Sequence, residues 1–209
     1  MSSSQLRGNV SSELDVARFI TTRWNIGGLG EWYFGVNLIS RDMKVSPDID
    51  LLKVYVNQFR PQENTTTGFE LKLLKARKYG KATWRIDLDR FYQGLGQVLT
   101  YFEHGLDKAA LIVGFHENCN EHPSEAGGAD RLLKTHCSFL GSSVLRAFPY
   151  LQIYSLRNEE LKLLHHSPDW DKARFPHLSD EAKLRRESIF KLQFASRKST
   201  RPDLARTKT

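Results

Sequence analysis

Apolar side chains recur at helical spacing in several segments of the chain. In residues 11–24, Leu14, Ala17 and Ile20 can share one face, and a serine at position 11 or 12 can cap the first turn. Gly105 can end the helix predicted over residues 90–105, because glycine readily adopts the left-handed conformation found at the ends of many helices. The pattern predicts helices over residues 11–24, 90–105, 131–148 and 181–193.

Shorter runs of β-branched, aromatic and aliphatic residues predict strands. The run AALIVGF (109–115) is apolar throughout, which is typical of a strand buried on both faces. The predicted strands cover residues 31–40, 51–56, 68–75, 109–115 and 151–156. Residues 76–90 and 116–130 are polar, and we expect them to be irregular.

The order of these elements indicates the fold class. Only a loop, residues 57–67, separates the second and third strands, so we expect an antiparallel hairpin. A helix separates the last two strands, which indicates parallel neighbours joined by a crossover. The sequence therefore predicts an α/β fold, with a mixed sheet and a central antiparallel hairpin flanked by helices.

Composition and length are those of a globular protein. The chain has 209 residues, of which 40% are hydrophobic and 26% charged, enough for one core domain. We expect a flexible N-terminus (1–10), a core domain (11–180), and a basic C-terminal helix with a disordered tail (181–209). No secretory signal, membrane span or disulfide framework is apparent, which favours an intracellular, cytoplasmic location and no membrane partner.

The net charge of +7 is concentrated at one end of the chain. From residue 183 onward there are nine basic and two acidic residues, an excess equal to the whole net charge. Such a tail can contact a phosphate backbone or can simply be solvated.

Acidic and basic residues interrupt the two strands of the predicted hairpin. Because side chains alternate across a strand, Glu70 and Lys72 share a face, as do Asp48 and Asp50. Pairing position 56 with position 68 would place Asp50 near Leu74, about one pair from Lys72, with Glu70 farther along. The loop leaves this register open by a few residues.

Such a cluster suggests a particular chemistry. Carboxylates in a half-buried site repel one another unless a cation neutralises them, and ligands that are all oxygen suit Mg²⁺ or Mn²⁺. A neighbouring lysine can hydrogen-bond an attacking water or a phosphate oxygen. These groups together are suited to phosphodiester hydrolysis. The alternative is a surface strand with structural Glu–Lys pairs.

The motif Pro47-Asp48-Ile49-Asp50, followed by Glu70-Leu71-Lys72, resembles the PD-(D/E)xK nuclease superfamily. The layout is similar to that of Mrr-type restriction enzymes, archaeal Holliday junction resolvases and RecB-type nucleases. The resemblance implies a restriction-endonuclease-like fold in which Asp50 and Glu70 bind metal and Lys72 is catalytic. Asp48, on the same face as Asp50, is a further candidate ligand.

Two other features of the chain fit the same family. Many members carry an acid on the first helix that reaches the metal, and Glu13 is the candidate here, although an acid is also favoured there by the helix dipole. The helix after the second motif carries a QxxxY pattern at Gln97 and Tyr101, as in RecB-type nucleases. The resemblance implies that Gln97 assists catalysis and that Tyr101 contacts nucleic acid.

We therefore expect a DNA endonuclease that depends on Mg²⁺ or Mn²⁺ and acts as a homodimer or within a larger nuclease complex. The alternatives are a nucleic-acid-binding protein without catalysis, or a subunit of a restriction, transposition or repair complex that is inactive alone. The residues predicted to grip phosphates are Lys75, Arg77, Lys78, Lys81, Arg85, Arg197 and Lys198.

Overall fold

A computed structural model of the chain gives the arrangement of its elements. It describes residues 10–24, 26, 29–37, 48–80, 83–121, 123–141, 145, 148, 150–167, 169–170 and 179–196. For residues 48, 83, 120, 121, 123–130 and 191–196 the description covers the backbone alone. The predicted N-terminal segment, up to residue 9, and the tail from residue 197 lie outside the described residues.

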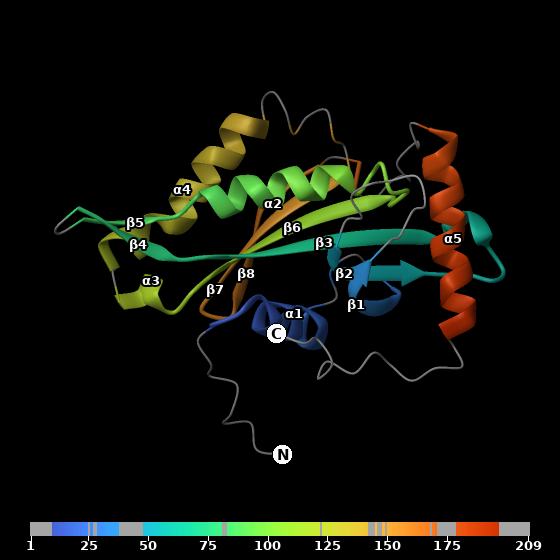
Figure 1. The fold of residues 1–209 in the computed structure, drawn as a ribbon, viewed down its shortest axis with the longest axis horizontal. Helices are drawn as coiled ribbons and strands as arrows, with labels where there is room; N and C mark the ends of the chain where they lie inside the picture. The colour runs from blue at the N-terminus through green and yellow to red at the C-terminus, as the bar shows by residue number, and fades with distance from the viewer. Residues whose placement is uncertain are drawn as a thin grey trace, which may run out of the picture.

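A six-stranded mixed sheet forms the centre of the molecule (Figure 1). Its spatial order is β1-β2-β3-β6-β7-β8, in which β3, β6 and β7 are parallel neighbours and the other pairs are antiparallel. The strands are β1 (Glu31–Asn37), β2 (Asp48–Tyr55), β3 (Thr65–Leu74), β6 (Lys108–Phe115), β7 (Leu151–Arg157) and β8 (Glu160–His166). A separate two-stranded sheet pairs β4 (Ala76–Tyr79) with β5 (Thr83–Ile86).

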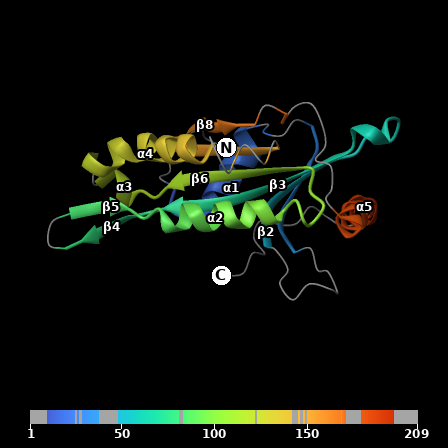
Figure 2. The same cartoon turned by 90° about the horizontal axis from the view of Figure 1, so that it is seen from above.

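Helices cover both faces of the six-stranded sheet. Helix α1 packs on one face, and α2 and α4 lie together on the other, as Figures 1 and 2 show. The helices are α1 (Glu13–Arg23), the 3₁₀ turn η1 (Pro61–Glu63), α2 (Asp89–Thr100), α3 (Asn118–Glu121), α4 (Pro123–Gly141) and α5 (Asp180–Ser196). None of the helices in the described residues is both long and apolar enough to cross a membrane.

Strand β3 occupies the middle of the sheet, and its alternating residues serve the two helical layers. Phe69, Leu71 and Leu73 belong to the core beneath α1. Gly68 faces α2, where a Cβ atom would lie 2.4 Å from Leu106 Cδ2. The absence of a Cβ atom at Gly68 therefore permits the α2 layer to pack closely on β3, next to the residues that follow Gly68 on that strand.

Helix α5 is fastened to the main body through a buried carboxylate. Arg186 Nε lies 2.8 Å from Asp107 Oδ1, and the other oxygen of Asp107 accepts the backbone N–H of Thr66 at 3.0 Å. Asp107 is fully buried. Part of the basic charge of the C-terminal helix is therefore used to dock the helix, and is not available for phosphate contacts.

The predicted fold class is confirmed at the level of a mixed sheet with helices on both faces. The capped start of α1 is confirmed too, since Ser12 and Asp15 form a reciprocal capping box. Two predicted irregular segments were wrong: residues 76–90 contain β4, β5 and the start of α2, and residues 116–130 contain α3 and the start of α4. The helix predicted over 131–148 ends at residue 141.

Strand β8 was not predicted. Its exposed and half-buried positions do not alternate regularly, so its sequence lacks the pattern of a half-buried strand. The turn that leads into it has positive φ at both Asn158 and Glu159, at 50° and 62°. A two-residue hairpin turn of this kind usually contains glycine, and its absence hid the turn in the sequence.

Candidate metal-binding and catalytic site

The site forms where strands β2 and β3 separate. Their pairing runs from Tyr55 opposite Thr65 to Leu51 opposite Phe69. Continued by one residue, this register brings Asp50 to Glu70 and not to Leu74, so the predicted register was wrong by four residues along β3. The three threonines at 65–67, assigned to the loop from sequence, begin β3 and lengthen the hairpin.

Two carboxylates bind the backbone of β3 beyond this point of separation. Asp50 Oδ2 accepts the N–H of Leu71 at 2.7 Å, and Glu13 Oε1 accepts the N–H of Leu73 at 3.4 Å. Residues two apart on a strand direct their N–H groups to the same edge. One side chain from β2 and one from α1 therefore take the place of a missing strand partner along this edge of β3.

Glu70 lies at the centre of the cluster and is almost completely buried, with 1% of its surface exposed. Its Oε1 lies 2.5 Å from Lys72 Nζ, and its Oε2 accepts a hydrogen bond from the hydroxyl of Tyr101. Burial raises the pKa of Glu70, although the bonds from Lys72 and Tyr101 act in the opposite direction. The predicted common face of Glu70 and Lys72 is confirmed by their ion pair.

Asp50 is half-buried and electrostatically coupled to the same cluster. Burial, followed by the negative charge of Glu70, raises the pKa of Asp50 to about 7, while the hydrogen bond from Leu71 N–H opposes the rise. A carboxylate with such a pKa is only partly ionised at neutral pH. Neutralising the negative charge around it would favour the ionised form.

Helix α2 shapes the space above Lys72. A Cβ atom on Gly94 would lie 2.6 Å from Lys72 Cγ and 2.8 Å from Leu111 Cδ1, so only glycine leaves room for the lysine chain. Gln97 and Tyr101 follow Gly94 by three and seven residues and share its face of the helix. Gln97 Oε1 is buried and has no hydrogen-bond partner in the described part of the chain.

Glu13 reaches the site from the first turn of α1, on the opposite layer. Its Oε1 also lies 3.5 Å from Arg90 Nη1, in the first turn of α2. Arg90 was not singled out from the sequence, because nothing there distinguishes it from any other arginine near the start of a helix. Glu13 and Arg90 connect the two helical layers where β2 and β3 separate.

The candidate metal ligands fit a divalent cation in donor type and charge, but they are not gathered as a finished site. Among the described residues, no three Asp, Glu, His or Cys side chains come together closely enough to hold a metal ion. Both oxygens of Glu70 already accept a hydrogen bond, one from Lys72 and one from Tyr101, so a cation at Glu70 would share its oxygens with these groups or displace one of them. Asp48 belongs to β2 by its backbone, and its side chain lies outside the described residues.

The residues predicted to contact nucleic acid have different outcomes. Lys75, Arg77, Lys78 and Arg85 are exposed on or beside the β4–β5 hairpin. Lys81, Arg197 and Lys198 lie outside the described residues. The prediction for Tyr101 was wrong: its side chain is fully buried, so its ring cannot stack on a base, and its hydroxyl serves Glu70 instead.

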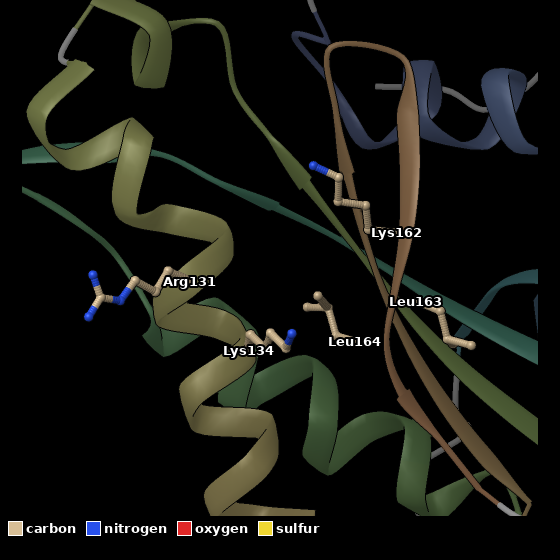
Figure 3. A pocket seen from close by; sticks show the side chains of 5 residues that line it. All are labelled: Arg131, Lys134, Lys162, Leu163 and Leu164. Carbon is tan, nitrogen blue, oxygen red and sulfur yellow. The ribbon is translucent and has the colours of Figure 1, made fainter.

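A separate cationic hollow lies between α4 and β8 (Figure 3). It measures about 430 Å³ and is lined by Arg131, Lys134, Lys162, Leu163 and Leu164. None of these residues was singled out from the sequence. Arg131 and Lys134 come from α4, whereas Lys162 comes from β8, farther along the chain. The hollow does not include the carboxylates of the β2–β3 site.

Comparison with known proteins identified no relative: the chain matches no protein-family model, no curated protein and no solved structure.

Proposed function

We propose that this protein is a metal-dependent DNA endonuclease with a restriction-endonuclease-like fold, and that Asp50, Glu70 and Lys72 form its catalytic centre. The observation that carries this proposal is the buried Glu70–Lys72 ion pair beside Asp50, at the place where β2 and β3 separate. Burying charges in the middle of a sheet costs free energy, and an apolar pair of similar volume is often at least as stable. A catalytic role gives a reason for keeping these charges.

Four acidic residues are the candidates to hold the metal ion. Asp50 and Glu70 would hold Mg²⁺ or Mn²⁺, with Glu13 and Asp48 as further oxygen donors. When bound, such an ion supplies a Lewis acid and a water of lowered pKa. Attack of such a water on phosphorus would break the bond to the leaving oxygen of the neighbouring nucleotide, and the proton of the water would pass to that oxygen or to solvent.

The remaining groups of the chain orient the reactants. Once its bond to Glu70 is exchanged, the ammonium of Lys72 can donate to the attacking water or to a phosphate oxygen. The Tyr101 hydroxyl holds the Glu70 carboxylate in place, and the Leu71 N–H does the same for Asp50. The unpartnered Oε1 of Gln97 can accept a hydrogen bond from a water on the same face of α2.

Cleavage of DNA by purified protein tests this proposal. Wild-type protein is incubated with supercoiled plasmid, a branched duplex and single-stranded DNA, with Mg²⁺, with Mn²⁺ or with EDTA. We expect cleavage of at least one substrate with metal alone, and a loss of at least about a hundredfold in rate in Glu70→Gln and Lys72→Met. Glu160→Gln and Lys183→Met remove exposed charges of the same kind and should cleave normally.

A second candidate function is nucleic-acid binding without catalysis, alone or as a subunit that needs a partner. It is favoured by the internal bonds on both oxygens of Glu70, which leave the carboxylate satisfied without a cation. This function predicts DNA binding without metal, no cleavage of any of the three substrates, and identical behaviour of wild type and Lys72→Met.

The proposed endonuclease makes a separate prediction about its assembly. Cutting both strands of a duplex would require two sites, so we expect a dimer or a larger assembly, which light scattering can measure.

A further inference from the structure

The β4–β5 hairpin forms a sheet of its own, and it is held at its base and by Trp84, which packs against the main core. Its two strands pair with each other, from Ala76 opposite Ile86 to Tyr79 opposite Thr83. At the base, Ala76 and Ile86 are buried, and both backbone groups of Ala76 are bound by the side chain of Asn118, at 3.2 and 3.0 Å. The hairpin projects beyond the helices at one end of the molecule (Figures 1 and 2).

The residues at the far end of this hairpin are open to solvent. A Cβ atom on Gly80 would meet no atom within 4 Å, and Tyr79 is 55% exposed. We call the described residues 75–80 and 83–86 the β-arm. Their four charged side chains, Lys75, Arg77, Lys78 and Arg85, are all basic.

The outward face of the β-arm carries two arginines side by side, and only one of them forms an ion pair with a carboxylate among the described residues. Arg77 lies directly opposite Arg85, although like charges in this position destabilise a strand pair. Arg77 is compensated by Asp87 at 2.9 Å, whereas the guanidinium of Arg85 lies over the Tyr79 ring at 5.6 Å. A polyanion would remove this repulsion, and an arginine beside an exposed tyrosine suits a phosphate next to a flat base or sugar.

The dimensions of the β-arm select one kind of polyanion. Two paired strands are about 4.8 Å apart and, with their side chains, match a groove about 12 Å wide. The major groove of B-form DNA has this width and admits a two-stranded ribbon. The major groove of duplex RNA is deep and narrow, and side chains cannot enter it.

We propose that the β-arm enters the major groove of duplex DNA and anchors the substrate beside the β2–β3 site. The chain runs from β3 directly into β4 (Figure 1). The six residues from Lys72 to Lys78 span about 20 Å, or about six base pairs, at about 3.3 Å per residue. This proposal rests on the proposed function for its class of ligand and adds where the duplex is held and which nucleic acid is accepted.

Binding without metal tests the β-arm separately from cleavage. Fluorescence anisotropy with EDTA measures the affinity for a 30-base-pair DNA duplex, an RNA duplex of the same sequence, and the single DNA strand, over a range of salt concentrations. The β-arm variant is Lys78→Ala/Arg85→Ala. The matched control is Lys134→Ala/Lys162→Ala, which removes the same charge from the cationic hollow of Figure 3.

We expect the β-arm variant to bind duplex DNA about tenfold to a hundredfold more weakly and to lower the slope of log affinity against log salt by about two. The control should change the affinity by about twofold or less. Wild type should prefer the DNA duplex to the RNA duplex by at least about tenfold, and the β-arm variant should lose most of that preference. All substituted side chains are exposed, so unfolding temperatures should stay close to that of wild type.

Three results would overturn the proposal: equal losses in the two double variants, equal wild-type affinity for the DNA and RNA duplexes, or tighter binding of the single strand than of duplex DNA. If wild type cleaves nothing but binds duplex DNA through the β-arm, the proposed catalytic function fails and this proposal stands. If it cleaves DNA while the β-arm variant binds like wild type, the reverse holds.

Discussion

Replacing Asp50 by asparagine should make the metal-free protein more stable at alkaline pH. The pKa of Asp50 is raised from 3.8 to about 7, chiefly by burial and then by the charge of Glu70. Asparagine keeps the shape and can still accept the N–H of Leu71, which lies 2.7 Å from the carboxylate. The substitution removes a negative charge whose burial beside Glu70 lowers the stability of the folded protein.

The size of the effect follows from the pKa. Each pH unit between the unfolded and folded pKa corresponds to about 1.36 kcal/mol, so a rise from 3.8 to about 7 amounts to about 4 kcal/mol. Asp50 is only half-buried, and solvent screens part of this cost. We therefore expect Asp50→Asn to raise the free energy of unfolding by about 1–4 kcal/mol at pH 8.

The sign of the pH dependence is set by proton binding. Between pH 3.8 and about 7, the folded state holds the Asp50 proton more tightly than the unfolded state does. The wild-type contribution from this group therefore falls as pH rises through that window, and is constant above it. The advantage of Asp50→Asn should accordingly be largest at pH 8 and close to zero at pH 4.

Urea denaturation at pH 4, 6 and 8 in the presence of EDTA measures this difference. Glu160→Gln removes an exposed carboxylate and controls for the loss of one negative charge. If Asp50→Asn is less stable than wild type at pH 8, or if its advantage is the same at every pH, then Asp50 does not occupy the half-buried position beside Glu70 described above.

Three further substitutions test the surroundings of the site. Tyr101→Phe removes the hydroxyl that donates to Glu70 and should weaken Mn²⁺ binding about tenfold to a hundredfold in calorimetric titration, and an unchanged affinity would contradict its positioning role. Gly94→Ala places a Cβ atom 2.6 Å from Lys72 Cγ and should lower the free energy of unfolding, measured by urea denaturation, by about 1–3 kcal/mol. Gly96→Ala has open space around it and should raise the same free energy by about 0.5–1 kcal/mol. Equal effects of the two substitutions would refute the close approach of α2. Asp107→Ala removes the buried acceptor that fastens α5 and should lower the free energy of unfolding by about 3 kcal/mol. Asp180→Ala removes an exposed carboxylate and should lower it by less than about 0.5 kcal/mol. Similar losses would show that the buried bond contributes little to stability.

Local patterns in the sequence were sufficient to predict much of the fold. The capping box at Ser12 and the apolar run of β6 each depend on residues close together in the chain. Alternation along β3 placed Glu70 and Lys72 on one face, which their ion pair confirms. These features are determined by helix and strand periodicity, which sequence alone reveals.

Features that depend on distant residues could not be predicted. The hairpin register follows from where β3 begins, and the threonines at 65–67 suit a strand as well as a polar loop. The QxxxY pattern pointed to Tyr101, but its burial against Gly68 depends on how α2 packs across the sheet. The bond between Asp107 and Arg186 joins residues 79 apart and leaves no local signal.

Titration calorimetry of the metal-free protein with Mn²⁺ at pH 7 measures whether β2 and β3 bring Asp50 and Glu70 together around one divalent ion, as we claim above. Because Asp50 has a pKa of about 7, binding should release about half a proton from it, which is measurable in buffers of different ionisation enthalpy. We predict a saturable Mn²⁺ site in wild type that is lost in Asp50→Ala and Glu70→Gln. A wild-type protein with no saturable site, or a site that persists unchanged in both variants, would contradict the claim.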